Sequence, residues 1–267
     1  MTALRPEQPT PDYVPGHDLL AGKVVVVTAA AGAGIGASVV RRALEEGARA
    51  VVFSDTHERR LTEAEETLAA EFGAGRVRQL VCDVTKEDDV QALLDAAEDL
   101  GGVDVMINNA GLGGTDSILD VTDETWNRVI DITLNGTMRA TRAAGQRFVA
   151  AGRKGVIVNN ASVIGWRAQE GQAHYAAAKA GVMALTRCAA LDLAPHGIRV
   201  NAVSPSLAMH PFLEKVTSAE LLGELKQREA FGRAAAPWEV ANVMIFLASD
   251  YSSYLTGEVI SVSSQHA

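Results

Sequence analysis

The strongest constraint on the fold is an alternation that begins at Lys23, where short runs of β-branched residues are separated by longer Ala-rich stretches. Several runs are hydrophobic at every position, as expected of parallel strands covered by helices on both faces. Strands spaced by helix-length segments indicate repeated β-α-β units. We therefore predict an α/β fold with one doubly wound, seven-stranded parallel sheet. The predicted strands span residues 24–27, 50–53, 77–81, 103–107, 156–159, 199–203 and 259–262.

The domain boundaries follow from composition. Residues 1–20 are polar and Pro-rich, so we expect a flexible N-terminal arm followed by one domain over residues 21–267. The arm has no apolar segment typical of a secretory signal, and no apolar run approaches the roughly 20 residues that cross a bilayer. Two isolated cysteines, Cys82 and Cys188, suit a reducing compartment. We expect a cytoplasmic protein without membrane partners.

Residues 206–237 break the alternation, because they have helical periodicity with no strand between them. In open α/β sheets, ligands bind beyond the carboxyl ends of the strands, and this segment follows such an end. It is therefore a candidate substrate lid. A pair of packing helices is the alternative.

The overall charge excludes one class of partner. The net charge is −9, and an acidic surface repels phosphate backbones, so we expect no nucleic-acid partner. A local basic pocket could still bind a small anionic substrate. No cluster of residues has the spacing of a metal site, and we expect none.

A glycine-rich loop separates the first predicted strand from the first helix. Glycines at this point let the backbone approach a pyrophosphate, and the N-terminus of the helix contributes unpaired N–H groups and partial positive charge. The loop therefore predicts a dinucleotide site. Its candidate binding residues are Thr28, Gly32, Gly34, Ile35 and Gly36.

The ends of the next strands supply further candidates for this site. Asp55 ends the second strand, where a carboxylate can accept hydrogen bonds from ribose hydroxyls and repel a 2′-phosphate. We therefore expect NAD rather than NADP. The third strand ends near Asp83, which is placed to bind an adenine amine. The other candidates at these strand ends are Val84, Asn109, Ala110 and Gly111.

Three side chains form a candidate catalytic group. Tyr175 and Lys179 are four residues apart in an Ala-rich stretch, so they share one helix face. A free tyrosine has a pKa near 10, and a nearby ammonium lowers it toward a value useful in acid–base catalysis. Ser162 follows the fifth strand and could orient a substrate carbonyl oxygen beside the phenol.

At this point the sequence resembles the short-chain dehydrogenase/reductase family from Lys23 to the C-terminus. The matching segments are TAAAGAGIG, CDV, NNAG, NNASVIG, YAAAK and VNAVSPS. The resemblance implies a Rossmann fold, hydride transfer between nicotinamide and an alcohol or ketone, and a homotetramer. It also implies that Ser162, Tyr175 and Lys179 are catalytic and that Tyr175 and Lys179 lie at the nicotinamide. The segment that runs beside the nicotinamide matches Pro205, Ser206 and Leu207.

Three positions depart from the family pattern. Ala29 replaces the first glycine of the loop, which is also one residue longer. Thr133 stands where the family has an asparagine that helps a proton-relay water, and we expect its backbone carbonyl to serve as a catalytic group. His210 aligns with a frequent threonine, so it is a candidate substrate contact.

Within the family, the sequence resembles an actinobacterial subgroup that acts on coenzyme A thioesters from degradation of steroid C and D rings. This resemblance implies an acyl-CoA substrate whose ring hydroxyl is oxidised to a ketone, with Ser162, Trp166, Arg167 and His210 as substrate residues. One alternative is NADPH-dependent reduction of a 3-oxoacyl thioester. Another is a non-catalytic protein that senses dinucleotides, since fold alone does not fix function.

Overall fold

The computed structural model describes residues 6–209, 213 and 218–264. Within them, seven strands form one sheet in the order β3-β2-β1-β4-β5-β6-β7, and every neighbouring pair is parallel. This confirms the predicted fold class. The strands are β1 (Val24–Val27), β2 (Ala50–Asp55), β3 (Val77–Val81), β4 (Val105–Asn108), β5 (Val156–Asn160), β6 (Arg199–Pro205) and β7 (Val259–Val262).

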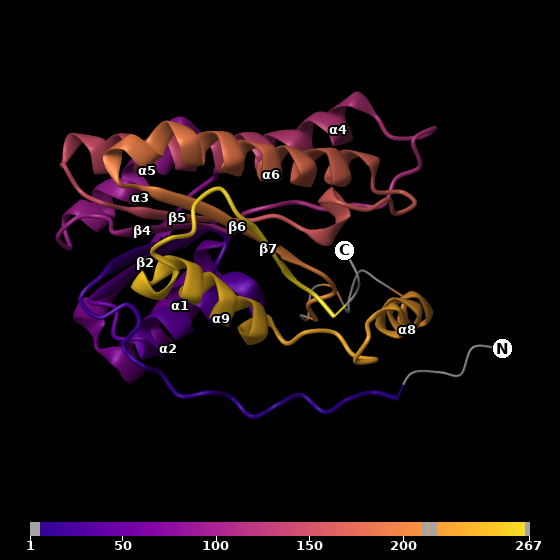
Figure 1. Cartoon of the computed structure of the whole chain (residues 1–267), viewed down its shortest axis with the longest axis horizontal. Helices are drawn as coiled ribbons and strands as arrows, with labels where there is room; N and C mark the ends of the chain where they lie inside the picture. The colour runs from indigo at the N-terminus through magenta and orange to yellow at the C-terminus, as the bar shows by residue number, and fades with distance from the viewer. Residues whose placement is uncertain (1–5, 210–212, 214–217, 265–267) are drawn as a thin grey trace.

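Helices cover both faces of the sheet. Figure 1 shows α3, α4, α5 and α6 on one side, α1, α2 and α9 on the other, and α8 apart from both layers. Among the described helices, none has the length and hydropathy that crossing a bilayer requires. The bounds are α1 (Ile35–Glu45), α2 (Glu58–Phe72), α3 (Glu87–Glu98), α4 (Asp123–Ile130), α5 (Gly136–Ala150), α6 (Ala173–Leu193), α8 (Ala219–Arg228) and α9 (Pro237–Ala248).

The unbroken valine run of β1 explains why the sheet needs two helical layers. Successive side chains of a strand point to opposite faces. Val25 and Val27 accordingly pack in the core beneath α1 and α9, whereas Val24 and Val26 pack in the core beneath α3 and α5. All four side chains are fully buried.

The chain order places a switch point between β1 and β4. From β1 the chain moves to β2 on one side, and β4 pairs with β1 on the other. The loops that leave these two strands therefore diverge and open a crevice at their carboxyl ends, where doubly wound sheets bind ligands. The glycine-rich loop and the segment Asn109–Gly111 both lie at this crevice.

The segment before the sheet makes contacts that the sequence pattern did not predict. Arg42 of α1 forms an ion pair with Glu46 at 2.6 Å, and its guanidinium donates to the carbonyl of Val14. The Glu46 carboxylate accepts from the backbone N–H groups of His17 at 2.7 Å and Leu19 at 3.1 Å. The described part of the arm is thus hydrogen-bonded to α1, although it contributes no strand.

The candidate lid contains one described helix, α8, which Ser218 caps through its hydroxyl. Before it, Ala208 pairs with Ala235 in an isolated parallel bridge. His210 lies outside the described residues, so its predicted substrate contact stays a prediction.

Candidate active site

The glycine-rich loop joins β1 to α1 at the switch point. Thr28 is buried, and its Oγ1 accepts from the backbone N–H groups of Asn109 at 3.0 Å and Ala110 at 3.1 Å. These bonds fix the end of β1 to the end of β4. No side chain caps the first turn of α1, which leaves its N–H groups available to an anionic ligand.

The glycines of this loop have two distinct roles. A Cβ on Gly36 would lie 2.5 Å from the carbonyl oxygen of Ala29 and 2.6 Å from Nδ2 of Asn109, so only glycine fits at this contact. A Cβ on Gly32 would meet no atom within 4 Å, so this glycine borders open space. A tight base with an open rim is what a pyrophosphate cradle needs.

Ala29 has a backbone conformation that usually belongs to glycine. Its φ is +53°, in the left-handed region that costs an L-residue roughly 1–2 kcal/mol. Its carbonyl oxygen accepts from Nδ2 of Asn109 at 2.9 Å, which holds the strained peptide in place. The departure from the family pattern at this position therefore places a non-glycine residue in a strained conformation.

Asp55 lies at the carboxyl end of β2, beside the glycine-rich loop. Its carboxylate accepts from the backbone N–H groups of Ala31 at 3.3 Å, Thr56 at 2.8 Å and His57 at 3.3 Å. These bonds hold the carboxylate beside the loop, and its predicted contact with ribose hydroxyls stays a prediction.

Asp83 and Val84 follow β3. The Asp83 carboxylate accepts from the N–H of Thr85 at 3.0 Å and from its hydroxyl at 2.7 Å, so it closes a local turn. Val84 is buried, and its Cγ2 would lie 2.7 Å from a Cβ on Gly136 of α5. Both residues border the crevice, with the carboxylate already engaged by its own turn.

Hydrogen bonds through Asn160 link the end of β4, beside the glycine-rich loop, to the predicted catalytic lysine. Asn160 at the end of β5 donates through Nδ2 to Oδ1 of Asn109 at 2.9 Å, and Nζ of Lys179 donates to the Asn160 carbonyl at 2.5 Å. Lys179 is 3% exposed, and a Cβ on Gly111 would lie 3.3 Å from Nζ. Sequence reasoning missed Asn160, because neither periodicity nor motif spacing marks its role.

Ser162 and Tyr175 meet as predicted. Ser162 precedes a short helical turn, and its Oγ accepts from the N–H of Ile164 at 3.2 Å. Tyr175 stands in the first turn of α6, and its phenol is hydrogen-bonded to the Ser162 side chain. The Lys179 Nζ lies 5.6 Å from the centroid of the Tyr175 ring. The structure therefore brings all three predicted catalytic side chains into one cluster.

The electrostatics of this cluster differ from the expectation that Lys179 dominates. Burial raises the pKa of Tyr175, and the hydrogen bond from Ser162 acts in the opposite direction. Burial also lowers the pKa of Lys179 to about 8. In both groups burial disfavours the charged form, so the phenolate and the ammonium are each harder to form than in water.

Thr133 lies in a π-helical turn, Asp131–Asn135, between α4 and α5. Its hydroxyl accepts from the Leu112 N–H at 2.9 Å and donates to the Leu112 carbonyl at 3.2 Å. Its own carbonyl accepts from the Thr137 hydroxyl at 2.8 Å. The side chain thus anchors the loop after β4. The catalytic use of its carbonyl stays a prediction.

The predicted substrate residues follow Ser162 directly. Trp166 is 50% exposed, and its Nε1 donates to Oγ of Ser204 at 2.9 Å, so the indole is anchored to β6. Arg167 is partly buried. On the opposite side, a Cβ on Gly113 would lie 3.8 Å from the Tyr175 ring, so the loop after β4 packs on the phenol.

The segment Pro205 to Leu207 leaves β6 beside β7. The Ser206 N–H donates to the carbonyl of Val262 at 3.1 Å. The Leu207 N–H donates to Oε1 of Glu229 at 3.3 Å, and its carbonyl accepts from Ala235 at 2.8 Å. The segment that follows β6 is therefore hydrogen-bonded to β7 on one side and to the region around α8 on the other. Sequence reasoning missed Glu229, which looks like a charged residue at a helix end.

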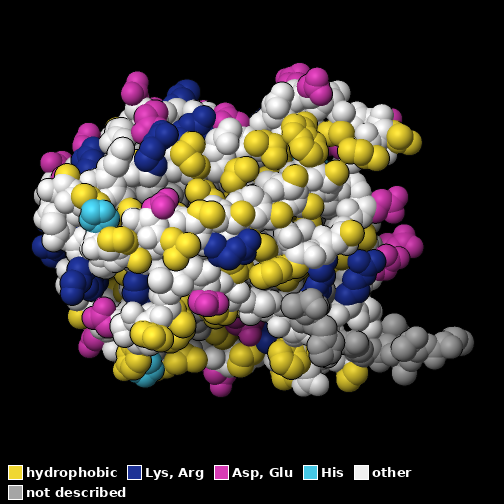
Figure 2. All heavy atoms as spheres, turned by 45° about the horizontal axis from the view of Figure 1, so that its top comes forward, with side chains coloured by type: hydrophobic (Ala, Val, Ile, Leu, Met, Phe, Trp, Pro, Cys, Tyr) yellow, Lys and Arg dark blue, Asp and Glu magenta, His cyan; other side chains and the backbone are white. Residues whose placement is uncertain are grey.

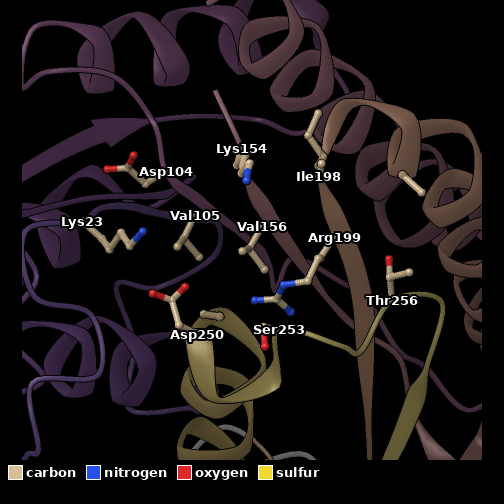
Figure 3. A pocket seen from close by; sticks show the side chains of 14 residues that line it. Lys23, Asp104, Val105, Lys154, Val156, Ile198, Arg199, Asp250, Ser253 and Thr256 are labelled. Carbon is tan, nitrogen blue, oxygen red and sulfur yellow. The ribbon is translucent and has the colours of Figure 1, made fainter. Parts of the chain in front are cut away.

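A cavity of about 490 Å³ lies at the amino-terminal ends of β4, β5 and β6, and none of the predicted site residues lines it. Figure 3 shows Arg199 among its side chains. This guanidinium donates to the carbonyls of Leu247 at 3.0 Å and Ser249 at 2.9 Å, so it satisfies the C-terminal end of α9. Among the described residues, no group of three His, Cys, Asp or Glu side chains could hold a metal ion.

Comparison with known proteins defines the class of this chain. A family model described as enoyl-(acyl carrier protein) reductase matches residues 29–264. Together with the fold and the site, this match makes the protein an oxidoreductase of the kind that uses a nicotinamide dinucleotide. The chain belongs to the short-chain dehydrogenase/reductase family.

Two of the curated relatives carry names that describe cyclic compounds. It is 62% identical to (5R,7aS)-5-hydroxy-7a-methyl-1-oxo-2,3,5,6,7,7a-hexahydro-1H-indene-carboxyl-CoA reductase of Mycobacterium tuberculosis, over 96% of this chain and 97% of that protein. It is 41% identical to cis-4-hydroxycyclohexanecarboxylate dehydrogenase of Sinomonas cyclohexanicum, over 92% and 96% of the two chains. A solved short-chain dehydrogenase of Mycobacterium smegmatis superposes with a TM-score of 0.86 at 56% identity, covering 97% of this chain and 99% of that chain.

Proposed function

We propose that this oxidoreductase uses NAD to interconvert a ring hydroxyl and a ketone on an acyl-CoA derived from steroid degradation. The observation that carries the reaction is the meeting of Ser162, Tyr175 and Lys179 beside the glycine-rich loop. The substrate class is supported by the 62% identical relative, whose name describes a bicyclic carboxyl-CoA.

The residues around the reacting oxygen have separate roles. The Tyr175 phenol exchanges a proton with the substrate oxygen as general acid or base. The Ser162 hydroxyl donates to that oxygen and steadies the developing charge. Lys179, held at the Asn160 carbonyl, keeps a positive charge near the phenol. A bound nicotinamide supplies the hydride acceptor or donor.

The dinucleotide would be held by the residues at the crevice. The uncapped first turn of α1 and the open face of Gly32 suit the pyrophosphate. Asp55 supports the choice of NAD, because a carboxylate at the end of β2 repels a 2′-phosphate. Asn109, Ala110 and Gly111 would support the cofactor from β4, and Pro205, Ser206 and Leu207 from β6.

The acyl-CoA itself would enter beside Trp166 and Arg167. The exposed indole is held rigid through Ser204, and a rigid aromatic face suits an apolar ring system. Thr133 would complete the site through its carbonyl. An NADPH-dependent 3-oxoacyl-thioester reductase is the second candidate, because a 3-oxoacyl-[acyl-carrier-protein] reductase of Thermotoga maritima is 37% identical over 91% of this chain and 97% of that protein.

One experiment separates these two functions. Initial rates are measured by nicotinamide absorbance with NAD or NADP and a panel of hydroxylated bicyclic acyl-CoA thioesters, 3-hydroxyacyl-CoA thioesters and the corresponding ketones. We expect turnover of the bicyclic substrates with NAD. A strong preference for NADP together with a linear 3-oxoacyl thioester would replace this proposal by the alternative. Dinucleotide binding with no turnover on any substrate would instead favour a sensing protein.

We also propose that the protein forms a homotetramer through the surface of α5 and α6. Apolar side chains gather on this side of the molecule in Figure 2. The groove between the two helices is lined by Met138, Val149 and Leu185, and Leu191 on α6 is 76% exposed. Contiguous exposed apolar surface of this kind marks interaction sites. Light scattering of the purified protein tests the assembly.

A further inference from the structure

The candidate lid contains a buried carboxylate that is not among the predicted site residues. Glu229 directly follows α8 and is 1% exposed. Placing a carboxylate in such surroundings is costly unless hydrogen bonds compensate the lost hydration. A glutamate at this position therefore needs partners, and the structure shows where they come from.

The two oxygens of Glu229 join segments that are far apart in the chain. Oε1 accepts from the Leu207 N–H at 3.3 Å, just after β6. Oε2 accepts from the Ser264 hydroxyl at 2.7 Å, just after β7. The Ala230 N–H donates to the Ser264 carbonyl at 3.0 Å. One side chain thus connects the exit of β6, the end of α8 and the segment that follows β7.

The Leu207 peptide has few other ways to keep its orientation. Its carbonyl is bonded to Ala235, and the neighbouring Ser206 N–H is bonded to Val262. Its N–H, however, is held by the Glu229 carboxylate, with no second acceptor among the residues that the structure describes. Removing the acceptor would leave the peptide free to rotate between its two fixed neighbours.

We propose that Glu229 is a positioning residue that orients the Ser206–Leu207 peptide for dinucleotide binding. The inference rests on the proposed function, because that proposal places Ser206 and Leu207 at the cofactor. Glu229 itself touches no reacting atom. It acts through the Leu207 N–H, and the bond to Ser264 fixes its carboxylate against β7.

Two nearly equal-sized substitutions test the role of the acceptor oxygen. Glu229→Gln keeps an oxygen for the Leu207 N–H, whereas Glu229→Met fills the same space without one. Dissociation constants for NAD and for NADP are measured by isothermal titration calorimetry, so the result depends on neither turnover nor the identity of the substrate. Glu220→Met on the exposed first turn of α8 is the matched control.

We expect the Met variant to bind the preferred dinucleotide about tenfold more weakly, because the Leu207 N–H loses its acceptor oxygen. The Gln variant and the Glu220→Met control should stay within about threefold of the wild type. A purely structural role would lower the unfolding temperature and leave the affinity of the folded protein unchanged. That result, or equal weakening in the Gln and Met variants, would overturn the inference.

A replacement variant and the result for the wild type complete the test. If the Met variant does not fold, Glu229→Asp replaces it, because aspartate keeps the charge but is too short to reach both partners, and the same tenfold weakening is expected. If the wild type binds neither NAD nor NADP, the proposed function has failed, and the positioning role fails with it. If the wild type binds and all variants bind equally, only the positioning role has failed.

Discussion

The Lys179 ammonium donates to the backbone carbonyl of Asn160 at 2.5 Å, and this bond attaches α6 to the end of β5. The Asn160 side-chain amide donates to Asn109. Asn109 in turn donates to the Ala29 carbonyl of the glycine-rich loop, so these contacts connect Lys179 to that loop. Lys179 is therefore positioned by the end of β5, two residues before Ser162, as well as by its own helix. A shift of β5 relative to α6 would move Ser162 relative to Tyr175 and Lys179.

Tyr175→Phe tests the acid–base role of the phenol. The substitution removes one hydroxyl and leaves the ring packed beside Gly113, so we expect kcat to fall about 10²–10⁴-fold, the usual contribution of a general acid or base. Dinucleotide affinity, measured by calorimetry, should stay within about threefold, since the ring and Lys179 remain. Tyr251→Phe, on an exposed residue, is the control. Turnover that survives in the Tyr175 variant would remove this residue from the mechanism.

The lowered pKa of Lys179 makes stability depend on pH in a defined direction. Burial moves it from 10.5 to about 8, so between these values the unfolded chain binds more protons than the folded one. Stability contributed by this group therefore rises with pH over that window. Relative to Lys179→Met, the wild type should gain up to about 3 kcal/mol between pH 7 and pH 10.5. Urea unfolding of both proteins without ligands checks this, and a constant difference would contradict it.

Ala29→Gly should relieve the strain at φ +53°. The gain of roughly 1–2 kcal/mol is partly offset by the greater freedom of glycine in the unfolded chain, about 0.4–1 kcal/mol. We expect a small net stabilisation of up to about 1 kcal/mol. Ala30→Gly is the matched control, because Ala30 is buried without a positive φ and should lose stability. If both variants lose stability equally, the strain is not real.

Asp55→Asn tests the choice of dinucleotide. Removing the negative charge at the end of β2 should raise the ratio of kcat/KM with NADP to that with NAD by at least about tenfold, or about 1.4 kcal/mol. Asp83→Asn, whose carboxylate closes a turn with Thr85, should leave the ratio unchanged. A ratio insensitive to Asp55 would mean that other residues discriminate against the 2′-phosphate.

Ser204→Ala tests the anchoring of Trp166. Losing the acceptor of the indole N–H should let the ring move and raise KM for the acyl-CoA about three- to tenfold, as expected for one hydrogen bond. The KM for the dinucleotide should not change. Replacing Trp166 itself by Phe, which lacks the donor, should give a similar increase. Equal increases in both KM values would instead indicate a general distortion at the end of β6.

Most of the architecture was predictable because strand and helix periods are local properties. The runs at residues 24–27, 77–81 and 259–262 match β1, β3 and β7. β4 begins two residues later than predicted, while β2 and β6 continue two residues further. Strand ends depend on pairing with neighbours, which no local pattern contains.

The candidate site was predictable only where residues carry chemistry at fixed spacing. Tyr175 and Lys179 are one helical turn apart, so their proximity follows from helix geometry. Asn160 and Glu229 could not be found in this way, because their partners are 51 and 22 residues away. The raised pKa of Tyr175 was also unexpected, since burial depends on the complete fold.

The contacts of Glu46 show that the folded unit begins before residue 21, because they include the backbone of His17 and Leu19. Trimming the chain at residue 21 would spare every strand and helix that the structure describes, yet it would remove the two backbone N–H groups that donate to this buried carboxylate. The truncated protein would keep the buried Glu46 carboxylate, with too few hydrogen-bond donors, at the C-terminal end of α1. The smallest stable version of this enzyme is therefore longer than its sheet and helices suggest.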